Sequence, residues 1–170
     1  MRFMGDTRQR THAVRRAEAD DAAALTRLRA LMLSAMGMLT EDSDPLWRDK
    51  AEAWFARRLR DKHDFAAFVI DDPELGVVSC AAGVCDHYAP GPANPGGVQG
   101  HVFNMSTDPR FRRFGYARAC LEALLAWFRD ETEARVVSLN ATKDGVALYR
   151  SLAFTEPRNT VLQLRLDRLR

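Results

Sequence analysis

The stretch 108–117 (DPRFRRFGYA) combines several arginines with one glycine, between two segments of different periodicity. Residues 101–107 (HVFNMST) form an apolar run that predicts a strand, and residues 118–129 (RACLEALLAWFR) have the spacing of an amphipathic helix. The first turn of a helix leaves backbone N–H groups without intrahelical partners, and the helix dipole adds partial positive charge there. Gly115 has no side chain to keep an anion away from this backbone. The stretch therefore predicts a phosphate or pyrophosphate site. Four arginines would add cationic side chains: Arg110, Arg112, Arg113 and Arg118.

Other phosphate-binding turns fit this sequence poorly. The chain has no Gly-x-x-x-x-Gly-Lys-Ser/Thr loop, and it lacks the three glycines and the early position of a dinucleotide-binding turn. The pattern Arg112-x-x-Gly115-x-Ala117, with Pro109 three residues earlier, resembles the Arg/Gln-x-x-Gly-x-Gly/Ala signature of the GNAT N-acetyltransferase superfamily. The alternative interpretation is that these arginines form an ordinary solvent-exposed surface and bind no ligand.

A second segment is similar to the C-terminal motif of that superfamily. Residues 139–157 (LNATKDGVALYRSLAFTEP) read as a strand, a short loop and a helix that carries a Leu-Tyr pair, followed by Phe154. Two positions depart from the usual pattern: Thr142 stands where many relatives have an Asn that contacts the pantetheine arm, and Ala153 replaces a common Gly. The two motifs have the expected order and separation, and together they cover roughly residues 100–156.

The resemblance implies a set of residues that bind acetyl-CoA. The turn would hold the pyrophosphate, and the strand before it would offer backbone groups to the pantetheine arm and the thioester carbonyl. The implied cofactor-binding residues are Met105, Ser106, Thr107, Arg112, Arg113, Phe114, Gly115, Tyr116, Ala117, Arg118 and Thr142.

Two residues are candidates for proton transfer. The resemblance implies that Tyr149, in the Leu-Tyr pair, directs its hydroxyl at the leaving sulfur of CoA; a helix tyrosine buried by its ring is the structural alternative. His101 lies six residues before Thr107, and a histidine side chain, whose reference pKa is about 6.5, suits a general base. Asp86 and His87 on the preceding strand are rivals, and a chain of waters is a further possibility.

An acidic loop, 41–44 (EDSD), lies between the first two expected helices, where relatives form part of the acceptor pocket. Its carboxylates would attract an amine. The simpler interpretation is a solvated loop in which Asp44, before Pro45, caps the next helix.

Composition bears on the remaining function classes. The chain has 170 residues, 46% of them hydrophobic, which suits one domain with an ordinary core. Its net charge is +2, with basic and acidic residues interspersed, so nucleic acid is not expected as a partner.

The sequence also gives no indication of a metal site or a membrane span. No Cys/His cluster has zinc spacing, so no metal is expected, and no apolar run approaches the ~20 residues of a membrane span. Three cysteines in apolar surroundings favour buried thiols in a reducing compartment, and hence a cytoplasmic protein: Cys80, Cys85 and Cys120.

The periodicities predict an α+β fold in the order βααβββαβαβ, with a mixed, mostly antiparallel central sheet flanked by helices on both faces. This is the GNAT-like order. We expect one domain over residues 12–170, preceded by a polar extension, 1–11. The expected strands are 13–16, 65–70, 77–88, 101–107, 135–141 and 160–166, and the expected helices begin near Asp21, Leu46, Arg118 and Asp144.

The sequence therefore predicts an acetyl-CoA-dependent N-acetyltransferase that acts on a small-molecule or peptide amine by direct attack in a ternary complex. A non-catalytic acyl-CoA-binding sensor is the main alternative, and a nucleic-acid binder that uses the arginine turn is a weaker one. Because GNAT relatives are often dimers, a homodimer is compatible with the resemblance. The sequence does not identify the acceptor.

Overall fold

A computed structural model of the chain describes residues 12–168, so the expected extension at 1–11 lies outside the described residues. The chain divides into two compact units, residues 1–140 and 141–170. In the first unit the elements are β1 (Val14–Arg16), α1 (Ala22–Ala35), α2 (Trp47–Arg58), β2 (Phe65–Asp72), β3 (Gly76–His87), β4 (Val98–Thr107), α3 (Tyr116–Glu131) and β5 (Val137–Leu139). The second unit contains α4 (Val146–Ser151). Three short 3-10 turns occur at Ala19–Asp21, Pro109–Phe111 and Leu166–Arg168.

The five strands of the first unit form one sheet in the order β1-β2-β3-β4-β5. The first three pairings are antiparallel, and β4 pairs with β5 in parallel. The sheet follows the chain order because tight turns and one hairpin loop join β2, β3 and β4, whereas the parallel β4–β5 pair is joined through α3. The mixed, mostly antiparallel sheet expected from the sequence is confirmed.

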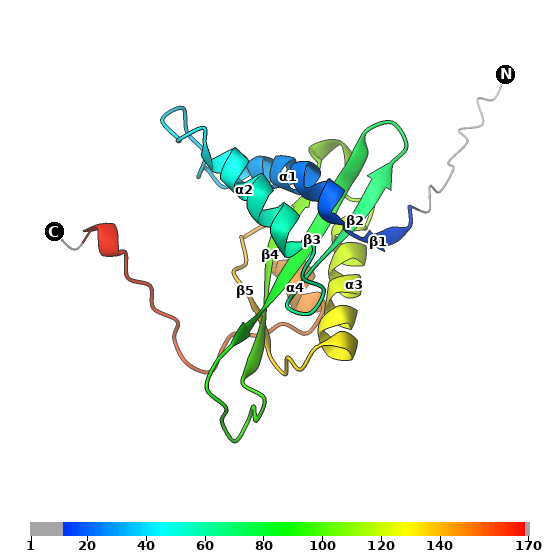
Figure 1. The fold of residues 1–170 in the computed structure, drawn as a ribbon. Helices are drawn as coiled ribbons and strands as arrows, with labels where there is room; N and C mark the ends of the chain where they lie inside the picture. The colour runs from blue at the N-terminus through cyan, green and yellow to red at the C-terminus, as the bar shows by residue number, and fades with distance from the viewer. Residues whose placement is uncertain (1–11, 169–170) are drawn as a thin grey trace. The chain divides into compact units, whose positions relative to one another are not determined.

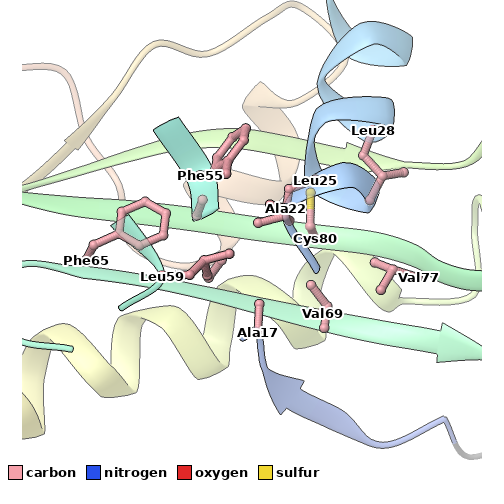
Figure 2. Close-up of a cluster of buried hydrophobic side chains, with 12 residues drawn as sticks. Ala17, Ala22, Leu25, Leu28, Phe55, Leu59, Phe65, Val69, Val77 and Cys80 are labelled. Carbon is pink, nitrogen blue, oxygen red and sulfur yellow. The ribbon is translucent and has the colours of Figure 1, made fainter. Parts of the chain in front are cut away.

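One face of the sheet packs against α1 and α2 (Figures 1 and 2). Leu25 and Leu28 of α1 and Phe55 of α2 are almost completely buried there, beside Val69 and Cys80 of the strands. The spacing of Leu25 and Leu28 places them on one side of α1, so that side of the helix lies along the sheet. This packing fixes α1 directly above the middle strands.

The opposite face of the sheet carries α3. Two strand glycines make room for it, because a Cβ on Gly83 or Gly100 would lie 2.7 Å or 2.6 Å from the ring of Phe128. Trp127 and Phe128 are buried at this contact. Helices therefore cover both faces of the sheet in the first unit, as predicted.

The expected closing strand at 160–166 is wrong. Residues 160–165 have no regular structure, and 166–168 form a 3-10 turn. The apolar side chains that suggested a strand are exposed: Val161, Leu162, Leu164 and Leu166. A strand exists only where a neighbouring strand accepts its backbone hydrogen bonds, and none pairs with this segment in the part of the chain that is described. The observed order is therefore βααβββαβα.

The remaining differences concern the ends of elements. Strand β4 begins at Val98 rather than at His101, because the last residues of the Pro- and Gly-rich segment already pair with β3. Strand β5 spans only Val137–Leu139 of the predicted 135–141. No helix among residues 12–168 is long and apolar enough to cross a membrane.

Candidate functional site

A β-bulge interrupts strand β4 at Asn104. Phe103 pairs with Ala82 and Ser106 pairs with Cys80, so two residues of β4 lie opposite one residue of β3. Asn104 has a φ of 51°, in the left-handed region that Asn adopts more readily than most residues. Its side chain is buried, and its Nδ2 donates to the Leu25 carbonyl of α1 at 3.4 Å. The bulge therefore changes the direction of β4 directly beneath α1.

Beyond the bulge, β4 loses its neighbour on one side. Pairing between β4 and β5 covers only Gly100–Val102 and Val137–Leu139. Phe103, Ser106 and Thr107 still pair with β3, but the edge of residues 103–107 toward β5 is not part of the parallel ladder. Met105, Ser106 and Thr107, the expected thioester-binding residues, all lie on this edge. Backbone groups on such an edge are available to an extended ligand.

Asp108 fixes the turn that follows β4. Its buried carboxylate accepts hydrogen bonds from the Arg110 backbone N–H at 3.1 Å and from the Arg110 guanidinium at 3.0 and 2.8 Å. The Asp108 backbone N–H donates to the Val78 carbonyl at 2.8 Å. The side-chain hydrogen bonds from Arg110 lower the pKa of Asp108 to about 2. Arg110 thus stabilises the turn itself, although the sequence suggested it as a ligand for phosphate.

Asp108→Asn should lower the free energy of unfolding by about 1–3 kcal/mol at pH 7, because it removes charge-assisted hydrogen bonds from a buried site. A carboxylate whose pKa is lowered by folding stabilises the protein above its unfolded pKa, here about 4. That contribution is lost as the pH falls from about 4 toward 2. Urea unfolding at pH 7 and pH 3 should therefore show a smaller gap between variant and parent at pH 3.

The matched control is Asp130→Asn, which removes an exposed carboxylate that also pairs with an arginine, Arg129. Exposed ion pairs contribute little, so this variant should unfold like the parent at both pH values. An Asp108→Asn deficit of the same size at pH 7 and pH 3 would contradict the assignment of the stabilisation to the charge.

The start of α3 is open to an approaching anion. Gly115 is the N-cap of α3, with a φ of 79°, and a Cβ there would have no atom within 4 Å. Arg113 also has a positive φ, 66°. Arg112, Arg113 and Phe114 are exposed, and neither arginine forms an ion pair within residues 12–168. The turn therefore leaves the first backbone N–H groups of α3 uncovered by a capping side chain, next to two cationic side chains.

Two other expected cofactor residues have internal partners. The Tyr116 side chain is largely buried, and its hydroxyl is 2.8 Å from Nδ1 of His12, whose Nε2 lies 3.9 Å from Asp72. Arg118 Nη1 donates to Glu122 one helical turn later, at 3.1 Å. Tyr116 therefore anchors the start of α3 to the sheet and offers a ligand only its backbone. Ala117 keeps the first turn of the helix narrow.

His101 of β4 pairs with Ser138 in the short parallel ladder between β4 and β5. Its Nδ1 is 3.1 Å from the Ser138 hydroxyl, which donates to the Gly100 carbonyl at 3.4 Å. The contact with Ser138 therefore orients the His101 ring through its Nδ1. His101 is four residues before Met105, roughly 13 Å along an extended strand.

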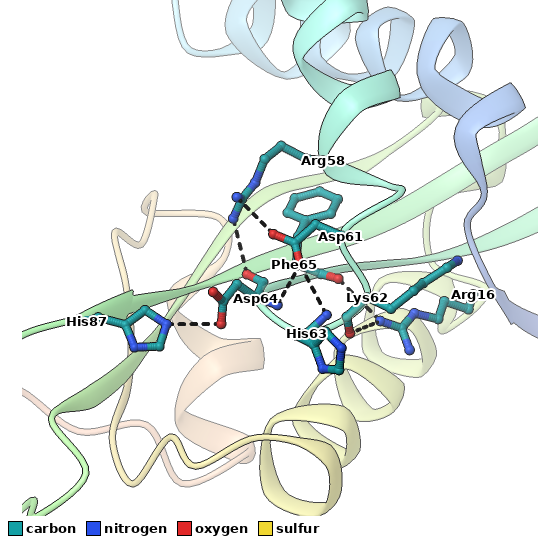
Figure 3. Close-up of polar contacts among 8 residues, drawn as sticks. All are labelled: Arg16, Arg58, Asp61, Lys62, His63, Asp64, Phe65 and His87. Atoms are coloured by element: carbon teal, nitrogen blue, oxygen red, sulfur yellow. Dashed lines mark hydrogen bonds and ion pairs between the residues drawn. The ribbon is translucent and has the colours of Figure 1, made fainter.

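His87 lies at the other end of the sheet (Figure 3). It pairs in register with Val98, nine residues before Thr107, or roughly 30 Å along the strand. Its Nε2 is 3.0 Å from Asp64, in the loop between α2 and β2. Arg58 donates to Asp61 in the same loop at 3.2 Å. This polar cluster organises the loop, and it does not bring His87 or its neighbour Asp86 to the phosphate turn.

In the acidic loop, the Asp44 carboxylate accepts from the Leu46 backbone N–H at 2.9 Å, just before α2. The simpler of the two interpretations, a helix-entry loop, therefore describes Asp44. Glu41 and Asp42 are exposed in the turn before it.

The second unit contains the remaining predicted residues. Tyr149 is partly buried on α4, and its ring packs edge to face against Phe154 with 6.0 Å between centroids. Burial raises the pKa of Tyr149, so its hydroxyl stays protonated at neutral pH. The Thr142 carbonyl accepts from the backbone N–H groups of Gly145 and Val146 at 3.0 and 3.1 Å, at the start of this helix.

The three cysteines are free and buried. Burial raises the pKa of Cys120 to about 12 and also raises that of Cys80, so both remain neutral thiols. Among residues 12–168, no group of three or more His, Cys, Asp or Glu side chains could hold a metal ion.

The model of the acetyltransferase (GNAT) family matches residues 26–154, which include the β4 bulge, the arginine turn and α4. The chain belongs to this family. A comparison with curated proteins found no match. The GNAT family implies acyl transfer from acetyl-CoA, and it uses amine acceptors.

Solved structures share the GNAT fold at low sequence identity. A predicted acetyltransferase from Clostridium acetobutylicum, solved with acetyl-CoA, has 20% identity and a TM-score of 0.80, over 94% of this chain and all of that one. Glucosamine-6-phosphate N-acetyltransferase from Arabidopsis thaliana has 16% identity and a TM-score of 0.62, over 91% and 98% of the two chains. Ribosomal-protein-alanine N-acetyltransferase from Brucella melitensis has 17% identity and a TM-score of 0.63, over the same shares.

Sequence reasoning missed three residues of this GNAT site. Asn104 forms the bulge, Asp108 organises the turn, and Ser138 orients His101. The sequence around Asn104 and Asp108 contained a clue to their roles, because Asn is uncommon inside strands and Asp-Pro favours the start of a turn. No sequence pattern marked Ser138, because its role depends on a neighbouring strand.

Proposed function

We propose that this protein is an N-acetyltransferase that moves the acetyl group of acetyl-CoA to an amine by direct attack in a ternary complex. The observation that carries the proposal is the continuous arrangement from Asn104 to Arg118. A bulged strand with one unpaired edge leads through a fixed turn to an uncapped helix start with exposed arginines. Acetyl-CoA has matching groups: an extended arm that ends in a thioester could lie along the strand edge, and its pyrophosphate could bind at the helix start.

The turn before α3 has room for the pyrophosphate of acetyl-CoA. No atom lies within 4 Å of the place where a side chain on Gly115 would begin, so phosphate oxygens could approach the backbone N–H groups there. Arg112, Arg113 and the backbone of Phe114 to Arg118 would hold the pyrophosphate, and the backbone of Met105 to Thr107 would orient the arm and polarise the thioester carbonyl. The thioester supplies an activated acetyl group.

In the proposed reaction, the neutral amine attacks the carbonyl carbon, a C–N bond forms and the C–S bond breaks. The proton lost by the amine passes through waters to His101 and from there to solvent. The leaving thiolate receives a proton from the Tyr149 hydroxyl, and solvent returns a proton to the tyrosinate. Because burial raises the pKa of Tyr149, its hydroxyl carries the proton to be donated at neutral pH. His101 is the proposed base, but about 13 Å of strand separates it from Met105, so it would act through waters.

A covalent acyl-cysteine route has no support in these residues. The raised pKa values of Cys80 and Cys120 disfavour the thiolate that would attack a thioester. Three unpaired thiols also support a role in the cytoplasm.

The proposal is tested by incubating the purified protein with acetyl-CoA and a panel of amines, with CoA release as the readout. Release that depends on both an amine and the protein is the expected result. If acetyl-CoA raises the melting temperature but no amine releases CoA, the protein is a binding module, the alternative function. If neither effect occurs, the proposed function is wrong.

A further inference from the structure

Arg29 is an internal cation without a carboxylate partner. It lies on α1, is partly buried, and its Nη1 donates only to the Asn104 Oδ1, at 3.4 Å. No ion pair is formed by Arg29 with any residue in the described range 12–168. Two residues earlier, Arg27 differs: its Nη1 is 3.7 Å from the Asp108 carboxylate, and its Nη2 donates to the Val77 carbonyl.

This arrangement is costly for the folded protein. Charged side chains are rarely buried unless they are paired, and burial lowers the pKa of Arg29. A guanidinium has five N–H donors, and a single long hydrogen bond to Asn104 uses one of them. The remaining donors are therefore suited to an anion that residues 12–168 do not provide.

The position of Arg29 links it to the reaction site. Its hydrogen-bond acceptor, Asn104, is the bulge residue and precedes Met105, where the proposed thioester-binding edge begins. Two further bonds hold α1 in place: Asn104 Nδ2 donates to the Leu25 carbonyl at 3.4 Å and Ser106 Oγ donates to the Leu28 carbonyl at 2.8 Å. These bonds place α1, and with it Arg29, beside the strand on which the acetyl group would lie.

We propose that the acceptor is an amine that also carries an anionic group, a carboxylate or a phosphate, and that Arg29 binds that group. This inference rests on the proposed acetyl transfer. An anion anchored at Arg29 would hold the attached amine near the thioester, and the planar fork of arginine binds carboxylate and phosphate oxygens in pairs. The anion and the amine would then be separated by only a few bonds.

The test uses matched pairs of acceptors that differ in the anion alone. The twenty common L-amino acids are compared with their carboxamides, and O-phosphoethanolamine with ethanolamine, with CoA release as the readout. We expect kcat/KM to be roughly 10- to 100-fold higher for the anionic member of an accepted pair, as for a charge-assisted hydrogen bond. The two sets of pairs distinguish a carboxylate from a phosphate.

Arg29→Met should abolish that preference, mainly by raising KM for the anionic acceptor, and should leave the binding of acetyl-CoA unchanged. Arg29→Gln is a second variant that can keep the hydrogen bond to Asn104 without the charge. The control is Arg57→Met, which removes an exposed charge from the adjacent helix α2 and should keep the preference.

The inference is overturned if neutral acceptors are used as well as their anionic partners, or if Arg29→Met keeps the preference. If no acceptor is turned over but acetyl-CoA binds, the same pairs are tested for a thermal shift in the presence of CoA. An anion-dependent shift that Arg29→Met loses supports the inference, and its absence overturns it. Loss of both acetyl-CoA binding and turnover would instead reject the proposed function itself.

Discussion

Tyr149→Phe should bind acetyl-CoA as the parent does and turn over roughly 10²–10⁴-fold more slowly, the usual contribution of general acid catalysis. The substitution removes only the hydroxyl, so the ring contact with Phe154 remains. Because burial raises the pKa of Tyr149, the hydroxyl is protonated through the neutral range. Activity that requires this protonated form should fall at alkaline pH in the parent, and the variant should lack that fall.

The measurement is kcat with a saturating amine, together with the thermal shift produced by acetyl-CoA. Tyr88→Phe is the control, because Tyr88 is exposed in the hairpin loop after β3 and should tolerate loss of its hydroxyl. A variant with the kcat of the parent would show that Tyr149 is not the acid. In that case its position on α4 would reflect packing alone.

Gly115→Glu should abolish the binding of acetyl-CoA. A carboxylate at this position would occupy the open space at the start of α3 and repel phosphate oxygens. In the parent, acetyl-CoA at a hundredfold excess over Kd should stabilise the fold by about 2.7 kcal/mol, measured as a rise in Tm. The variant should show no such rise at any concentration that saturates the parent.

Gly76→Glu separates this effect from backbone strain. Gly76 has a φ of 69°, close to the 79° of Gly115, and open space around it, but it is the first residue of β3, directly after the turn from β2. Both variants should lose similar stability without ligand, because a side chain is disfavoured at positive φ. Only Gly115→Glu should lose the ligand-dependent rise in Tm; an equal response in the two variants would mean that the pyrophosphate does not bind at this turn.

The local features of this site could be predicted from the sequence because each depends on neighbouring residues. Gly115 with its arginines marks a helix start, and the apolar spacing of residues 118–129 marks the helix that follows. The Leu-Tyr segment and the arginine turn together also indicated the GNAT family, which the family match shows. The prediction of a closing strand was wrong because a strand depends on residues that are distant in the sequence. The alternation in residues 160–166 is typical of a strand, but a strand forms only where a neighbouring strand accepts its hydrogen bonds.

The amino-acid sequence alone determined the class of fold, the order of the elements from β1 to α4, and the position of the arginine-rich turn before α3. The tertiary structure alone decided which cations are free to bind a ligand. Arg110 and Arg29 are alike as residue types, but Arg110 is paired with Asp108, whereas Arg29 lies beside Asn104 and pairs with no carboxylate in the described part of the chain. That difference arises from a bulge that places β4 against α1, and from contacts between residues 75 positions apart. Charge pairing depends on distance in space, and sequence spacing does not report it.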